Sequence, residues 1–316
     1  MKRVTLFFLV LVSMMLCIGF STVAWAQASL LANSPNLTPD QWVGQRFVFL
    51  ALPADKQSEG YEIFPEEQAE QGFAGDTSVR LPYKSFEGKV MMVSAVVPYL
   101  AGDQQYEYMV HFKDDKTGKT FLGRTMRGQL EGVVPEADLS KARQQLLGKT
   151  IYLKQRMLQG MYDPQVGEAA AAVPVKLGEA AQVLDVYTGL RANEPIWLIV
   201  QVHGQKAVLP IAYSWTNQPV TAWTEQSPWQ AALFLENPRT TLGWSDEIWN
   251  QLDAGTVEPG MTKEQVLLSW GAPVSVDEKT NGTEQAIWNY SSKMLTFQQD
   301  VLQAVKDIAM NEAAIP

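Results

Sequence analysis

The sequence predicts a multidomain, mostly β chain: two tandem small β-barrel-like repeats, followed by a two-layer α+β domain with two helices on an antiparallel sheet. Three observations predict it. Short segments rich in Val, Ile, Tyr and Phe, separated by Gly, Asp and Asn clusters, fill the middle of the chain. A module of about five such segments occurs twice. Near the C-terminus, apolar residues at helical spacing give way to strict alternation.

The first element in chain order is an export signal. A basic pair opens the chain, residues 4–20 are almost all apolar, and Ala24 and Ala26 have the spacing of a small-residue cleavage site. An uncleaved anchor helix is the alternative, which the cleavage pattern disfavours. We expect residues 1–26 to be a signal peptide that is removed during export, so that the mature periplasmic chain begins at Gln27.

Cys17 lies inside this apolar run and is the only cysteine of the sequence. A lipoprotein signal needs a small residue directly before the cysteine that receives the lipid, and Leu16 is large. We therefore expect no lipid on Cys17. The mature protein then contains no cysteine, and it can form no disulfide.

The charge balance limits the partners. Cleavage removes two of the 25 basic residues and none of the 34 acidic ones, which changes the formal net charge from −9 to −11. Nucleic acid and anionic lipid headgroups are poor partners for such a surface. No second apolar run is long enough to span a bilayer, so we expect no transmembrane helix after cleavage.

An internal repeat occupies the middle of the chain. Residues 42–50 align with 146–154, and two further blocks follow in the same order at an offset of roughly 85 to 105 residues. The pattern is loosely similar to SH3-like barrels, in which closure of the sheet removes exposed edges. One larger β-sandwich over both copies is the alternative. The alignment pairs His111 with Gln201. The two repeats are expected at residues 36–132 and 136–217.

Local signals define the C-terminal domain. Thr262 and Gln265 have capping-box spacing at the start of a helix that Gly271 and Pro273 end. Trp270 shares the inward face of this helix, so we expect it in the core between helix and sheet. Strands are expected around Val274 and Val276, around Ala286, Trp288 and Tyr290, and over Leu295, Phe297, Val301 and Ala304, with turns at Asn281-Gly282 and Gln299-Asp300.

These residues carry a resemblance to a known family. The G-M-T-x-x-x-V, W-G-x-P, W-x-Y and L-x-F elements occur in the order of the SmpA/OmlA (BamE-like) domain, and residues 245–252 supply its earlier amphipathic helix. The resemblance covers residues 241–308. It implies two helices on a three-stranded antiparallel sheet and a scaffolding role in outer-membrane assembly. An ordinary two-layer α+β domain is the alternative. The motif residues are Gly260, Met261, Thr262, Val266, Gly271, Pro273, Tyr290 and Phe297.

The segment that joins the repeats to this domain, residues 218–240, is rich in tryptophan and proline. Its rings either form a binding surface for a sugar or peptide, or serve as buried anchors between domains, and we favour the anchors. The candidate interaction or structural aromatics are Trp223, Trp229, Trp244, Trp249, Trp270 and Trp288.

The motifs of catalysis and metal binding are missing from the sequence. His111 and His203 are the two histidines, and neither stands in a metal-ligand pattern or near a marked serine. The paired carboxylates at Glu66-Glu67 and Asp114-Asp115 are sequence neighbours in polar stretches, which favours solvated charge over glycoside hydrolysis. We expect no enzyme activity, no cofactor and no metal.

The sequence therefore predicts an exported, non-enzymatic bacterial envelope protein. It would act as a scaffold or assembly factor by contacting another envelope protein, with possible peripheral association with the outer membrane. One alternative is a periplasmic inhibitor or binding protein of β-lactamase-inhibitor type, whose layers are similar to the BamE arrangement. Another is a cell-wall glycan-binding module that uses Trp223 and Trp229. Residues 309–316 are expected to be a disordered tail.

Overall fold

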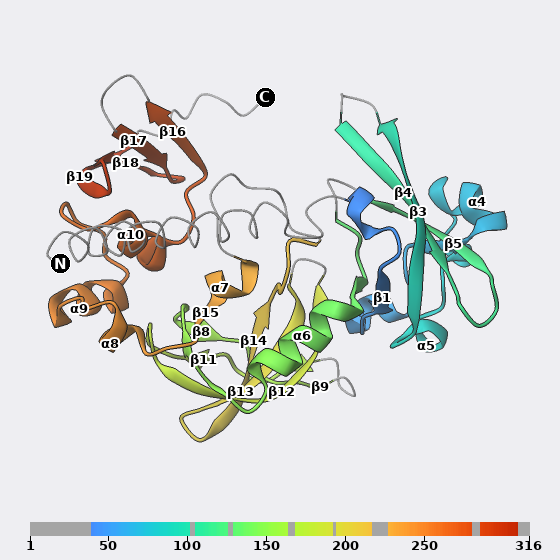
Figure 1. The fold of residues 1–316 in the computed structure, drawn as a ribbon, viewed down its shortest axis with the longest axis horizontal. Helices are drawn as coiled ribbons and strands as arrows, with labels where there is room; N and C mark the ends of the chain where they lie inside the picture. Colours follow the sequence, from blue (N-terminus) through green and yellow to red (C-terminus); the bar gives the residue numbers. More distant parts are fainter. Residues whose placement is uncertain are drawn as a thin grey trace, which may run out of the picture.

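The computed structural model describes residues 39–308, except 102–104, 126–128, 164–167, 192–193, 217–226 and 280–284. The fold is mostly β, and its larger sheets belong to three units that follow one another along the chain (Figure 1). None of the described helices is long and apolar enough to cross a membrane. The predicted signal peptide with Cys17, Trp223, the Asn281-Gly282 turn and the 309–316 tail lie outside the described residues.

The first unit, residues 39–135, is built on a six-stranded antiparallel sheet in the order β2-β5-β4-β3-β1-β6. A long hairpin forms its centre, and short helices connect its edge strands. The strands are β1 (Arg46–Phe49), β2 (Ile63–Pro65), β3 (Val90–Ala101), β4 (Gln105–Lys113), β5 (Thr120–Thr125) and β6 (Val133–Pro135). The helices are η1 (Pro39–Trp42), α3 (Ala54–Gln57), η2 (Glu66–Gln68), α4 (Ala69–Phe73), η3 (Thr77–Val79) and α5 (Tyr83–Phe86).

The second unit, residues 136–234, has a five-stranded sheet in the order β14-β13-β12-β7-β15. Two two-stranded ribbons, β8 with β11 and β9 with β10, replace the helices of the first unit. Its elements are α6 (Glu136–Leu146), β7 (Thr150–Leu153), β8 (Met157–Leu158), β9 (Tyr162–Asp163), β10 (Glu168–Ala169), β11 (Val173–Pro174), β12 (Ala180–Arg191), β13 (Glu194–Val202), β14 (Gln205–Ile211), α7 (Pro228–Ala232) and β15 (Leu233–Phe234).

The two units share a strand order, because β6-β1-β3-β4-β5 corresponds to β15-β7-β12-β13-β14. No strand pair joins the two sheets, so the described residues contain no single sandwich sheet over both units. In the pairings of the described residues neither sheet closes, since β2 and β6 end the first and β14 and β15 end the second. The closure expected of a complete barrel is therefore not seen.

Equivalent glycines place β1 and β7 in the same way. Gly44 N–H donates to Val93 O at 2.8 Å, and Gly148 N–H donates to Val183 O at 2.9 Å. Both glycines have φ in the left-handed region, +82° and +74°, where a side chain would be strained. A second equivalent pair, Gly88 and Gly178, makes similar bonds. Their N–H groups donate to the last carbonyl oxygens of β1 and β7 at 2.9 and 2.7 Å. These four turns fix where each short strand meets its long neighbour.

A β-bulge follows at the same place in both units, between Val93 and Ala95 in β3 and between Val183 and Asp185 in β12. The bulge decides the register of the next strand. Val93 lies opposite Phe112 and Val183 opposite Val200, so the counterpart of His111 is Ile199. The sequence alignment with Gln201 was wrong by two residues. Val93 and Val183 are 90 residues apart, whereas their partners Phe112 and Val200 are 88 apart, so the second hairpin is two residues shorter than the first.

Each unit has its own core. In the first unit aromatic rings dominate: Phe47, Phe49 and Phe112 are at most 1 % exposed, and Phe47 meets Phe112 edge-on at 6.0 Å. In the second unit aliphatic residues fill the equivalent positions, with Ile151, Leu153 and Val200 all fully buried. The two cores have the same place in the fold and different chemistry.

The C-terminal unit, residues 238–308, packs helices on a four-stranded antiparallel meander in the order β16-β17-β18-β19. The resemblance implied three strands, and the fourth comes from the hairpin at Gln299-Asp300, where Gln299 has φ +54°. The elements are α8 (Pro238–Thr241), α9 (Asp246–Ala254), α10 (Lys263–Trp270), β16 (Ser275–Lys279), β17 (Gln285–Asn289), β18 (Lys293–Gln298) and β19 (Val301–Asp307).

Two strands lie beyond the expected boundaries of the repeats. β6 follows residue 132, and β15 lies inside the segment 218–240 that was expected to join domains. Trp229 packs on the second core and stacks at 16° to Tyr213, with 6.3 Å between ring centroids. Residues 228–234 of this aromatic stretch are thus a piece of the second unit rather than a link between domains.

Asp138 is a buried carboxylate at the start of α6, only 3 % exposed. Ser214 Oγ donates to its Oδ2 at 2.5 Å, and Ser214 Oγ accepts from Thr216 N–H at 3.1 Å. Burial raises the pKa of Asp138 to about 6, against the opposing effects of Ser214 and Lys141. The carboxylate therefore ties α6 to the chain that leaves β14, at a cost in desolvation when it is charged.

The stability of the protein should therefore depend on pH through Asp138. Its pKa is higher in the folded state than in the unfolded chain (3.8), so the folded state binds the proton more tightly. The stabilisation of the folded state by the protonated Asp138 carboxyl is complete below pH 4 and is lost as pH rises through 6. Between pH 4.5 and 7.5, denaturant titration should show wild type losing on the order of 2 kcal/mol relative to Asp138→Asn. An equal pH dependence in both proteins would contradict this assignment.

Candidate functional site

The motif residues of the C-terminal unit converge on the start of α10. Thr262 caps the helix, accepting from Gln265 N–H at 3.3 Å, while the Gln265 side chain accepts from Thr262 N–H at 2.8 Å. The preceding residues form a strap along β19: Gly260 N–H donates to Leu302 O, and Leu302 N–H donates to Met261 O, both at 2.8 Å. Met261 is 1 % exposed. The G-M-T run therefore joins the helix layer to the edge of the sheet.

A second group of motif residues lies at the end of α10. Tyr290 Oη donates to Gly271 O at 2.8 Å, and burial raises the pKa of this phenol to about 12. The Trp270 ring meets Tyr290 edge-on at 5.4 Å and donates from Nε1 to Gly255 O at 2.8 Å. Trp270 is only partly buried. It lies at the rim of the core rather than in its centre, because its indole N–H reaches the carboxyl end of α9.

The other tryptophans of the unit differ in exposure. Trp288 is 4 % exposed and packs on Phe297 with ring centroids 4.6 Å apart. Trp249 is 1 % exposed, with the partly buried Trp244 on one side at 5.2 Å and the guanidinium of Arg239 over its ring at 4.6 Å. Motif residues Val266 and Phe297 are fully buried, and Pro273 is also buried. These residues build the unit and offer little surface to a partner.

The core of the C-terminal unit contains a residue from the second unit. Leu177, in the turn before β12, is fully buried among Trp249, Leu252 and their neighbours. Its backbone is held as well: its N–H donates to Asp253 Oδ1 at 3.2 Å, and Arg239 donates to its carbonyl oxygen at 3.1 Å. The two units therefore share one apolar cluster.

Arg156 makes the polar half of this junction. From the second unit it donates to Leu252 O in the last turn of α9 and to Ser269 O in the last turn of α10, the latter at 3.1 Å. The last carbonyls of a helix lack partners within the helix and carry partial negative charge, so one guanidinium satisfies both helix ends. Burial lowers the pKa of Arg156, and Asp253 opposes that shift.

The sequence could not reveal this junction. In the first unit the turn equivalent to that of Leu177 carries Glu87, which is exposed, and the position equivalent to Arg156 is Leu52, which is buried. A leucine in a turn and a lone arginine are ordinary in sequence. Only the fold brings them to the helices of another unit.

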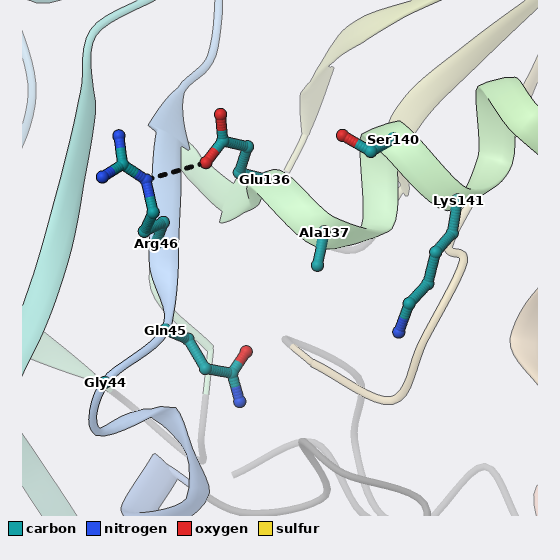
Figure 2. A pocket seen from close by; sticks show the side chains of 7 residues that line it. All are labelled: Gly44, Gln45, Arg46, Glu136, Ala137, Ser140 and Lys141. Carbon is teal, nitrogen blue, oxygen red and sulfur yellow. Dashed lines mark hydrogen bonds and ion pairs between the residues drawn. The ribbon is translucent and has the colours of Figure 1, made fainter.

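A hollow of about 410 Å³ lies where the first unit meets α6 (Figure 2). Arg46 spans it, with ion pairs to Glu136 at 2.9 Å and to Asp115 at 2.8 Å. Its guanidinium is thus engaged by two carboxylates, and Glu136 raises its pKa most. The hollow is an interface between units. It is lined by Gly44, Gln45, Arg46, Glu136, Ala137, Ser140 and Lys141.

The remaining polar candidates lie apart from one another. His203 forms the turn between β13 and β14, with φ +52°, and its ring contacts Glu179. His111 lies on β4 opposite Ala95. Asp114 shapes the turn after β4, where the Lys116 N–H lowers its pKa. Within the described residues no group of three or more His, Cys, Asp or Glu is placed to hold a metal ion.

Comparison with known proteins adds no relative. No family model, no curated protein and no solved structure matches the chain.

Truncating the shared residue should destabilise the C-terminal unit. Leu177→Ala removes a fully buried side chain and should lower the unfolding free energy by about 2–5 kcal/mol. Glu87→Ala, at the equivalent exposed position of the first unit, is the matched control and should change it by less than about 0.5 kcal/mol. Thermal unfolding followed by tryptophan fluorescence measures both. Similar values for the two variants would show that the shared core does not stabilise the fold.

Proposed function

We propose that this chain is an exported, non-enzymatic bacterial envelope protein that acts as a scaffold or assembly factor at the outer membrane. Its C-terminal unit would be a BamE-like domain, and its partner another envelope protein. The observation that carries the proposal is the contact between motif elements separated in sequence: the G-M-T strap lies along β19, and Tyr290 of the W-x-Y element bonds to Gly271 of the W-G-x-P element. Motif elements that are conserved in a family for its fold should contact one another, and these do.

The proposal includes the two repeats as SH3-like modules that extend the scaffold. Their common strand order and their equivalent glycine turns support a common origin. The open ends of both sheets are the departure from closed SH3-like barrels. Among the glycan-binding candidates, Trp229 packs on the second core, which favours an anchoring role for that ring.

The docking of the C-terminal unit limits where a partner can bind. The carboxyl ends of both helices meet Arg156, and Leu177 fills the core beside α9. The face of the sheet that points away from the helices carries Ile287 and Thr296, which are partly buried, and Asp277, which is exposed. We therefore assign the partner surface to the outer face of the C-terminal sheet.

Export and partner contact can be tested in one bacterial experiment. The protein recovered from the envelope should have an intact mass that starts at Gln27, with no diacylglyceryl group on Cys17. A photo-crosslinking amino acid at Asp277 should capture an envelope protein, and the same group at Lys84 of the first unit is the control. A chain that retains residues 1–26 in the cytoplasm would refute the proposal. So would equal capture from both positions.

A further inference from the structure

The two units differ at one edge of their long hairpins. β3 and β12 have 12 residues each, but β1 and β7 pair only with their first three residues. The backbone bonds of Gly44 and Gly148 extend this contact by one position. Beyond it, within the part of the chain that the structure describes, β3 and β12 have strand neighbours on one side only. Figure 1 shows β3 and β4 extending past β1. Each unit therefore carries a stretch of sheet edge, which is a template for an added strand.

The outward groups of this edge can be identified from the register. Val96 lies opposite Val110, and Pro98, two residues on, has no N–H to give to β4. Alternate residues of a strand bond to opposite sides, so Val96 and Pro98 turn their backbone groups away from β4. Val186 is the equivalent of Val96 in the second unit. It lies opposite Leu198 in the same way.

The second unit closes its edge with its own side chains. Asp185 Oδ1 accepts from Val186 N–H at 2.8 Å, and Arg143 Nη2 donates to Val186 O at 2.5 Å. Arg143 reaches this carbonyl from α6 and also lies 3.7 Å from Asp185. Both outward groups of Val186 are satisfied. This is the protection that proteins give to an edge that must not pair.

Among the described residues, the first unit has no such cap. Ala95 occupies the position of Asp185, and Pro39 that of Arg143, and neither side chain can form a hydrogen bond. In the described part of the chain no hydrogen bond reaches the outward N–H or C=O of Val96. Val97, the next residue of β3, is 48 % exposed, and Val43, which precedes the Gly44 that bonds to Val93 O, is 51 % exposed.

We propose that the Val96 edge of β3 binds an extended segment of another protein by strand addition. The proposal rests on the proposed function and names one of its contact sites. An extended strand can accept from the N–H of Val96 and donate to its C=O at the same time. The aliphatic side chains of such a strand would contact Val43 and Val97. The expected mature chain has a formal net charge of −11, so like charges disfavour a second copy of this chain as the ligand. A strand flanked by lysines would be attracted by the acidic chain.

The free protein gives the first test. In amide hydrogen exchange the Val96 N–H should exchange at least tenfold faster than the Val186 N–H, because only the latter has a side-chain acceptor. Equal protection of the two amides in the free protein would overturn the proposal.

The second test uses the heptapeptide KVTVTVK as a model strand with the full mature chain. The peptide should bind at one site and protect the Val96 amide. Ala95→Asp copies the cap of the second unit and should weaken binding at least tenfold. The reverse variant, Asp185→Ala with Arg143→Ala, uncaps the second edge and should raise the stoichiometry from one peptide to two.

Three results would overturn the inference: no binding of the peptide, binding that Ala95→Asp leaves unchanged, or a protein dimer that Ala95→Asp dissolves. The last result would identify the occupant as a second copy of the chain. Crosslinking of an envelope protein from Asp277 is independent of this edge. The scaffold proposal can therefore stand when the edge proposal fails.

Discussion

The burial of Leu177 in the core of the C-terminal unit is the contact on which the arrangement of the chain depends. A small helix-on-sheet unit has little apolar surface to bury, and here part of its core is supplied by the neighbouring unit. Arg156 adds the polar counterpart by satisfying the carboxyl ends of both helices. Because apolar packing and helix-end hydrogen bonds act at one junction, the second and C-terminal units hold a fixed relation.

The two repeats have the same strand order and differ in the contacts around it. The glycine turns that position β1 and β7 are the same, since their left-handed backbone conformation would strain any other residue. The residues beside those turns have diverged. Leu177 enters another core where Glu87 stays in solvent, and Asp185 caps an edge where Ala95 leaves it open. Comparing equivalent positions of the two units therefore shows which contacts are made by only one of them.

Sequence reasoning predicted the local features of the fold. The Thr262 cap, the end of α10 at Gly271 and the Gln299-Asp300 hairpin depend on neighbouring residues, and the structure has each of them. It could not predict contacts that join distant elements. The second hairpin is two residues shorter than the first, which makes Ile199 rather than Gln201 the counterpart of His111. The place of Leu177 in the core of another unit leaves no periodic signal. The interaction sites proposed here depend on such long-range contacts.

Hydrogen exchange at increasing denaturant tests the central claim most directly. Amides of β12 in the second unit and of β17 in the C-terminal unit should lose protection at the same denaturant concentration, because the shared core around Leu177 makes the two sheets one cooperative unit. Loss of protection in β17 at a clearly lower denaturant concentration, while β12 stays protected, would contradict the account.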